Sequence, residues 1–262
     1  MASALAILQA PLLAQVEIRD RTDATCVQEN KTFCFNWAID NFDRYLTPLW
    51  EHLQLVVISV VLGFLLAFGM ALLSHRQRWL VPTFTGATGI LYTIPSLAFF
   101  FLLLPITGRG RDTAIIALTA YTLQIIYRNI VTGLNNVPAE AKDAGRGMGM
   151  TDRQLLSRVE LPLAVPEIIA GLRIATVSTV AIATLAVFAG GGGLGTQIYS
   201  GSNLTFKTGI LIAGGLAVLM AIVFDLLLVI LQRLLTPWRT APVSERETKT
   251  TRFTDLFRRT AT

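Results

Sequence analysis

Five long stretches of the chain carry almost no charged residues, and they limit the folds that the chain can adopt. They cover residues 53–73, 84–104, 113–134, 166–189 and 208–231. A helix that crosses the roughly 30 Å hydrocarbon core of a bilayer needs about 20 apolar residues. Glycine, alanine, serine and threonine within the stretches allow helices to pack closely in lipid. The sequence therefore predicts an all-α integral membrane protein with five core transmembrane helices.

The composition supports the membrane assignment and excludes several classes of protein. Hydrophobic residues make up 53% of the 262 residues and charged residues only 15%, whereas soluble domains carry about 25% charged residues. The net charge of +5 comes from basic residues in the connections and the C-terminal tail, so we exclude nucleic acid as a partner. With two cysteines and two histidines, neither a disulfide scaffold nor a Cys/His metal site is expected.

The distribution of lysine and arginine predicts the orientation in the membrane. If the region before the first span lies outside, thirteen of these residues fall in inner segments and seven in outer segments. Cytoplasmic loops are the more basic ones. We therefore expect an interfacial or extracytoplasmic segment (1–50), a transmembrane domain (51–236) whose connection 135–165 is cytoplasmic, and a basic cytoplasmic tail (237–262).

The region before the first span leaves two questions open. Residues 1–14 are apolar, but they are too short to span and Pro11 interrupts them. They form either an interfacial or docking helix or a short sixth span. Cys26 and Cys34 follow in a polar outer segment, where an oxidising environment permits a disulfide. Both the bridged and the free state are compatible with the sequence.

The connection 135–165 has the sequence features of two short helices. Asn136 is placed to cap a first helix whose first turn holds Pro138 and Glu140. Gly145, Gly147 and Gly149 then permit a sharp turn.

The second short helix of this connection opens with a capping box at Thr151 and Gln154. Leu155, Leu156 and Val159 give it an apolar face, and Pro162 is expected to end it. Such a hairpin either lies on the bilayer surface or inserts into a groove of a soluble partner.

The spacing within this hairpin resembles the EAA loop of ABC importer permeases. That pattern is Glu-Ala-Ala, three residues, Gly, nine residues, and Ile, any residue, Leu-Pro. The spacing here is the same, but three residues differ from the pattern. Asp143 replaces Glu, Gly145 replaces the second Ala, and Val159 replaces Ile. The resemblance implies that an ATPase is coupled through Asp143, Ala144, Gly145, Gly149, Val159, Leu161 and Pro162.

Further segments resemble the osmoprotectant branch of that family. They are YTIPSLAFF, GMGMT, VELPLAVPEIIAGLRIA and AVFAGGGGLG, and the resemblance covers about residues 50–235. It implies a multi-pass permease subunit in a bacterial inner membrane, forming the pathway for glycine betaine, choline or carnitine. The implied partners are a second permease subunit, a cytoplasmic ATPase dimer that holds ATP and Mg²⁺, and an extracytoplasmic solute-binding protein. The chain itself is then neither an enzyme nor a cofactor carrier.

Other functions fit the sequence less well. The alternative within the same class is the permease of an amino-acid or methionine importer. A membrane enzyme would need a nucleophile or an acid–base pair near the end of a span, and no such set is present in the sequence. A channel or secondary carrier has no use for a cytoplasmic hairpin with EAA spacing.

A glycine-rich run follows the fourth span. It lacks the Gly-Lys-Ser/Thr of a phosphate-binding loop, so nucleotide binding is excluded. It is either a flexible turn or an outer-mouth turn that moves in gating or touches the binding protein. Its key residues are Gly191, Gly192, Gly193 and Gly195.

Two polar residues and one proline interrupt the spans. Arg173 and Asp225 both lie about 10–12 Å from the cytoplasmic ends of their spans. They either pair with each other or reach water separately. Pro95 must free a backbone carbonyl in the second span, either as a packing kink or as a bend near the pathway.

Overall fold

The computed structural model describes residues 26–240, and every regular element from Phe35 onward is helical. Residues 1–14 and most of the expected tail (241–262) lie outside the described part. The elements are α2 (Phe35–Asp40), η1 (Phe42–Tyr45), α3 (Leu46–Arg76), α4 (Leu80–Thr93), α5 (Ser96–Thr107), α6 (Arg111–Asn135), α7 (Ala139–Gly147), α8 (Asp152–Leu155), η2 (Leu156–Glu160), α9 (Leu161–Ala183), η3 (Thr184–Ala189), α10 (Leu194–Asn203), α11 (Lys207–Leu235) and η4 (Pro237–Thr240).

Four helical segments within the described residues are long and apolar enough to cross a membrane. They are Phe42–Arg76, Arg111–Asn135, Asp152–Ala189 and Lys207–Leu235. Helices α4 and α5 make a fifth span if they are counted together, but they are bent by 98°. The five spans predicted from the sequence match these segments, and α10 is an additional short helix after the glycine-rich run.

The bend between α4 and α5 lies at Pro95. Ile94, the residue before this proline, has an extended conformation (φ −67°, ψ 127°), as the proline ring favours for its predecessor. Pro95 itself precedes the first residue of α5, and its carbonyl accepts a hydrogen bond from the Phe99 N–H at 2.9 Å. Pro95 therefore lies between two separate helices. It does not kink a single continuous helix.

Helix α6 lies at the centre of the fold, with α3, α4 and α9 packed around it. Gly63 of α3 lies directly against Thr122, and Gly171 of α9 lies against Asn129. A side chain at either glycine would collide with α6. Because lipid provides little hydrophobic driving force between helices, such close backbone contacts are a main source of packing energy.

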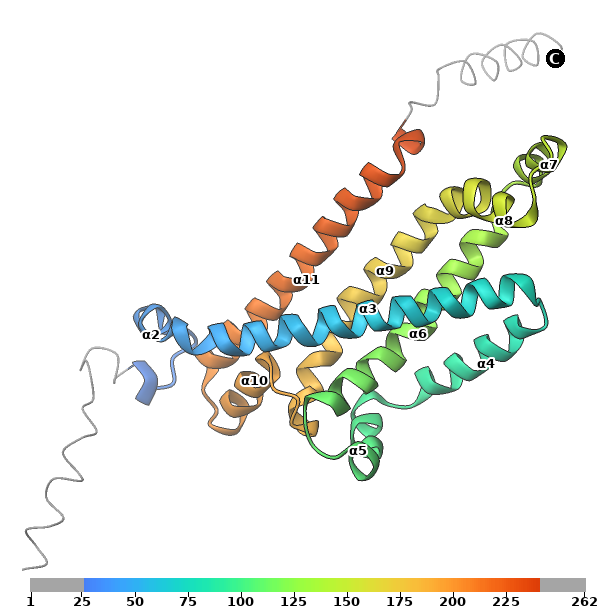
Figure 1. Cartoon of the computed structure of the whole chain (residues 1–262). Helices are drawn as coiled ribbons and strands as arrows, with labels where there is room; N and C mark the ends of the chain where they lie inside the picture. The colour runs from blue at the N-terminus through green and yellow to red at the C-terminus, as the bar shows by residue number, and fades with distance from the viewer. Residues whose placement is uncertain (1–25, 241–262) are drawn as a thin grey trace, which may run out of the picture.

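The two ends of the bundle carry different short helices (Figure 1). The short helices α7 and α8 lie at one end, and α2, α5 and α10 lie at the other. Helix α3 runs between them, so its first turns lie near α2 and its last turns near the α7–α8 hairpin.

Candidate functional site

The segment between α6 and α9 forms the expected hairpin, with two corrections to its boundaries. Asn136 follows α6 as its C-terminal cap, and Pro138 precedes the first residue of α7. The prediction that Asn136 caps α7 was therefore wrong, because α6 continues further than its apolar stretch. The position of Glu140 in the first turn of α7 agrees with the sequence analysis.

The turn between α7 and α8 depends on one of the three glycines. Gly149 has φ +76°, a left-handed conformation that costs other residues energy. Gly147 is the last residue of α7 and has open space around it. Gly145 is buried, and a Cβ there would lie 2.6 Å from Leu155 Cδ1. Gly145 therefore allows α7 to pack closely on α8, although glycine is a weak helix former.

The second half of the hairpin opens as predicted and ends differently. Thr151 and Gln154 form the capping box, with each side chain bonded to the backbone N–H of the other residue. The prediction that Pro162 ends this helix was wrong. Pro162 is the second residue of α9, which directly follows the π-helical η2. The hairpin thus runs through the π-helical η2 directly into the span.

A buried carboxylate connects this hairpin to the end of α3. Glu160 is only 4% exposed. Its Oε2 lies 3.1 Å from His75 Nε2, and its Oε1 lies 3.7 Å from Lys142 Nζ. Lys142 also donates a hydrogen bond to the Leu134 carbonyl at 3.3 Å. One buried acid therefore joins α3, α7 and the start of α9.

A cavity of about 1260 Å³ opens beside this carboxylate. Its walls come from the end of α3, the α3–α4 turn, the end of α6 and both hairpin helices. It is rich in basic side chains, namely His75, Arg76, Arg78, Lys142, Arg146 and Arg153. On the outer surface of the hairpin, Asp143 and Ala144 are exposed and Met148 is 70% exposed. Methionine is one of the residue types enriched in protein–protein interfaces.

At the opposite end, the glycine-rich run makes a tight turn between η3 and α10. Gly190, Gly192 and Gly193 all have φ near +80°. The Gly193 N–H donates a hydrogen bond to Glu51 Oε2 at 2.9 Å, so a carboxylate from the first turns of α3 holds the turn. A Cβ on Gly192 would lie 2.6 Å from the same oxygen.

Gly195 was predicted to lie in this turn and does not, and His52 contacts the turn although the sequence analysis did not predict it. Gly195 lies inside α10, not in the turn, and its Cα packs on the Thr184 carbonyl. His52 is fully buried, its Nε2 lies 3.1 Å from the Val180 carbonyl oxygen, and its ring lies against Gly193. The sequence lacked a signal for these contacts, because Glu51 and His52 are about 140 residues away from the turn.

The structure contains the intramembrane ion pair between α9 and α11. Arg173 Nε and Nη2 donate to the two carboxylate oxygens of Asp225 at 2.8 and 2.9 Å. Their side chains are about one-third exposed, at 32% and 35%. Such a two-point geometry is the strongest form of an arginine–carboxylate contact.

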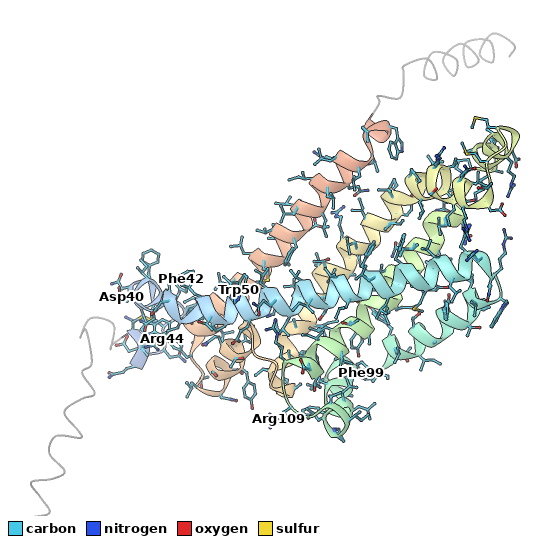
Figure 2. All side chains as sticks on the ribbon, viewed as in Figure 1. Asp40, Phe42, Arg44, Trp50, Phe99 and Arg109 are labelled. Atoms are coloured by element: carbon cyan, nitrogen blue, oxygen red, sulfur yellow. A yellow bond between two sulfur atoms is a disulfide. The ribbon has the colours of Figure 1, made fainter. Side chains whose placement is uncertain are left out.

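Cys26 and Cys34 are joined by a disulfide, and the loop that they close packs on the start of α11. The Cys34 N–H donates to Thr208 Oγ1 at 3.0 Å, and the Trp37 ring meets Phe206 edge-on at 4.6 Å. Figure 2 shows Asp40, Phe42 and Arg44 at this same end of the molecule. The disulfide loop is therefore part of the folded end of the bundle that carries α2 and α10.

Comparison with known proteins agrees with this geometry. Residues 59–240 match the family described as binding-protein-dependent transport system inner membrane component. The choline transport system permease protein OpuBB of Bacillus subtilis is 39% identical over 198 residues, which are 75% of this chain and 91% of that protein. The osmoprotectant import permease protein OsmW of Salmonella typhimurium is 38% identical over 211 residues, 77% and 96% of the two chains.

Solved structures share the same fold. A chain of the MetNI methionine ABC transporter in an inward-facing conformation aligns with a TM-score of 0.68 at 23% sequence identity. The alignment covers 73% of the present chain and 96% of that one. The helical arrangement is therefore that of an ABC importer permease.

Proposed function

This chain belongs to the family of inner membrane components of binding-protein-dependent transport systems, and we propose that its permease pathway carries glycine betaine, choline or carnitine. As an ABC importer permease it is a multi-pass inner membrane protein that works with ATPase and solute-binding partners. The substrate proposal is supported by relatives named for choline and osmoprotectant transport, and by the YTIPSLAFF and GGGGLG segments of the sequence.

The α7–α8 hairpin carries the coupling proposal. Its exposed face, with Asp143, Ala144 and Met148, fits a groove on a cytoplasmic ATPase. Its base is tied to α3 through the contacts of Glu160 with His75 and Lys142. Since the hairpin continues into α9 without an intervening loop, movement of the ATPase would displace α9 and α3 together.

The remaining partners are part of the same proposal. Two permease subunits, identical or related, enclose the pathway, and each hairpin contacts one subunit of an ATPase dimer. ATP and Mg²⁺ bind to the ATPase, which hydrolyses the nucleotide. The hairpin end faces the cytoplasm, in agreement with its excess of basic residues, and the end with the disulfide and the Glu51–Gly193 contact faces the solute-binding protein.

The substrate is tested by transport in proteoliposomes. The chain is reconstituted with its ATPase and binding protein, and ATP-driven uptake of labelled glycine betaine, choline, carnitine and methionine is measured. We expect uptake of at least one of the first three and none of methionine. Uptake of methionine alone would overturn the substrate class and leave the permease assignment intact.

A further inference from the structure

Helix α6 is covered on three sides by its neighbours. Toward α3, Tyr127 donates to Ser74 Oγ at 3.2 Å. Toward α4, Thr88 is hydrogen-bonded to Gln124. Toward α9, Asn129 lies against Gly171. These contacts leave one strip of α6 uncovered, between α4 and α9.

The uncovered strip is polar. Arg128, Thr132 and Asn135 are all exposed, and their spacing of four and three residues places them on one helical face. Arg128 lies seven residues before the end of α6 at Asn135, which is about 10 Å along the helix axis. Asn135 also lines the basic cavity near the hairpin, so the strip opens to water at the end that we assign to the cytoplasm.

At this depth, an arginine that faces lipid must either extend its side chain to the interface or leave a charge in the hydrocarbon region, which costs several kcal/mol. Arg173, the comparable residue of α9, is neutralised by Asp225. Within residues 26–240, by contrast, Arg128 takes part in none of the ion pairs that the structure contains. Its guanidinium therefore needs water or an anion in front of it.

We propose that this strip of α6 lines the aqueous pathway and that Arg128 binds the carboxylate of the solute in transit. The inference rests on the proposed function, since it concerns the same pathway. A guanidinium offers two parallel N–H donors to a carboxylate. Glycine betaine and carnitine carry a carboxylate next to their trimethylammonium group, whereas choline carries a hydroxyl. Arg128 then distinguishes the solutes by this one group.

The pathway assignment is tested by thiol accessibility, which requires no solute. Both cysteines of the chain are held in the disulfide, so wild type provides an unreactive background. Arg128→Cys and Thr132→Cys are compared with Val61→Cys, an exposed apolar position of α3. A membrane-impermeant methanethiosulfonate reagent is added from the cytoplasmic side. We expect the two α6 variants to react at least tenfold faster than Val61→Cys. Equal rates would place the strip in lipid or against a second copy and overturn the proposal.

The role of Arg128 is tested by transport of matched solutes. For Arg128→Gln we expect uptake of glycine betaine and carnitine to fall at least tenfold through a higher KM, and choline uptake to stay within twofold. Arg128→Lys should retain part of the carboxylate-dependent uptake. Arg233→Gln, an exposed arginine in the last turn of α11, controls for loss of surface charge and should transport all solutes normally.

Two outcomes contradict the carboxylate role. Equal loss of choline and betaine uptake in Arg128→Gln would show that the arginine is structural, and wild-type uptake of choline alone would leave no carboxylate for it to bind. If wild type transports none of these solutes, the proposed function fails, while the accessibility assay still decides whether the strip lines an aqueous pathway.

Discussion

Arg173 and Asp225 form a two-point ion pair that joins α9 to α11 within the membrane. The exposed surface of α11 is mostly apolar, and few of its residues are buried. This pair is therefore a main polar contact that fixes the position of α11 against the rest of the bundle.

The ion pair can be tested by a double-mutant cycle. Arg173→Ala and Asp225→Ala each leave one charge without its partner, so each should lower thermal stability in detergent. The double variant should be more stable than the sum of the two losses implies, with a coupling free energy of about 1–3 kcal/mol. Additive losses would show that the two residues do not stabilise each other.

The disulfide should stabilise the end of the protein that carries α2 and α10. Closing a loop between residues eight positions apart restricts the unfolded chain, and the expected contribution is about 2–3 kcal/mol. Cys26→Ser/Cys34→Ser should melt at a lower temperature than wild type under oxidising conditions and at the same temperature under reducing conditions. Thiol labelling of wild type without a reductant would contradict the disulfide.

Gly149 and Gly147 provide a matched pair for the hairpin turn. Gly149→Ala places a side chain at φ +76° and should destabilise the turn by about 1–2 kcal/mol. Gly147→Ala lies in α7 with open space around it and should stabilise the helix by up to about 1 kcal/mol. Hydrogen exchange of residues 139–160 should therefore speed up in the first variant and slow down in the second. Equal effects would refute this account of the turn.

Gly195 and Gly214 provide a second pair, for the contact between α10 and η3. A Cβ at Gly195 overlaps the Thr184 carbonyl, and backbone cannot move aside as a flexible side chain can. Gly195→Ala should lower the melting temperature strongly, because overpacking typically costs about 1–3 kcal/mol. Gly214→Ala in α11 has open space and should be neutral or stabilising. A neutral Gly195→Ala would show that α10 is not packed on η3 in the membrane.

The sequence predicted those parts of the fold that depend on local composition. The spans follow from uninterrupted apolar stretches, and the Thr151–Gln154 capping box from residues three apart. The end of the second hairpin helix was not predicted correctly. Pro162 is compatible with the first turn of a helix as well as with the end of one, and only the continuous path from η2 into α9 decides between them.

Contacts between distant segments could not be predicted in this way. Glu51 holds the turn at Gly193, and Glu160 pairs with His75, because the fold brings together segments far apart in the chain. Arg128 was counted as part of an apolar stretch. Its importance depends on which face of α6 stays uncovered, and this becomes visible only when α3, α4 and α9 are in place. The Arg173–Asp225 pair was one of the two alternatives that the sequence left open, because both residues lie at about the same depth from the ends of their spans.

The most direct test of the central claim is ATP hydrolysis by the complex of this chain with its ATPase in lipid. Activity is measured with and without the solute-binding protein loaded with glycine betaine, for wild type and for Gly149→Val, which places a β-branched residue at φ +76° in the hairpin turn. We expect the loaded binding protein to stimulate wild-type hydrolysis several-fold, and the variant, although folded in the membrane, to lose its association with the ATPase. An ATPase that fails to bind wild type, or that binds and responds equally well to the variant, would contradict the coupling role of the hairpin.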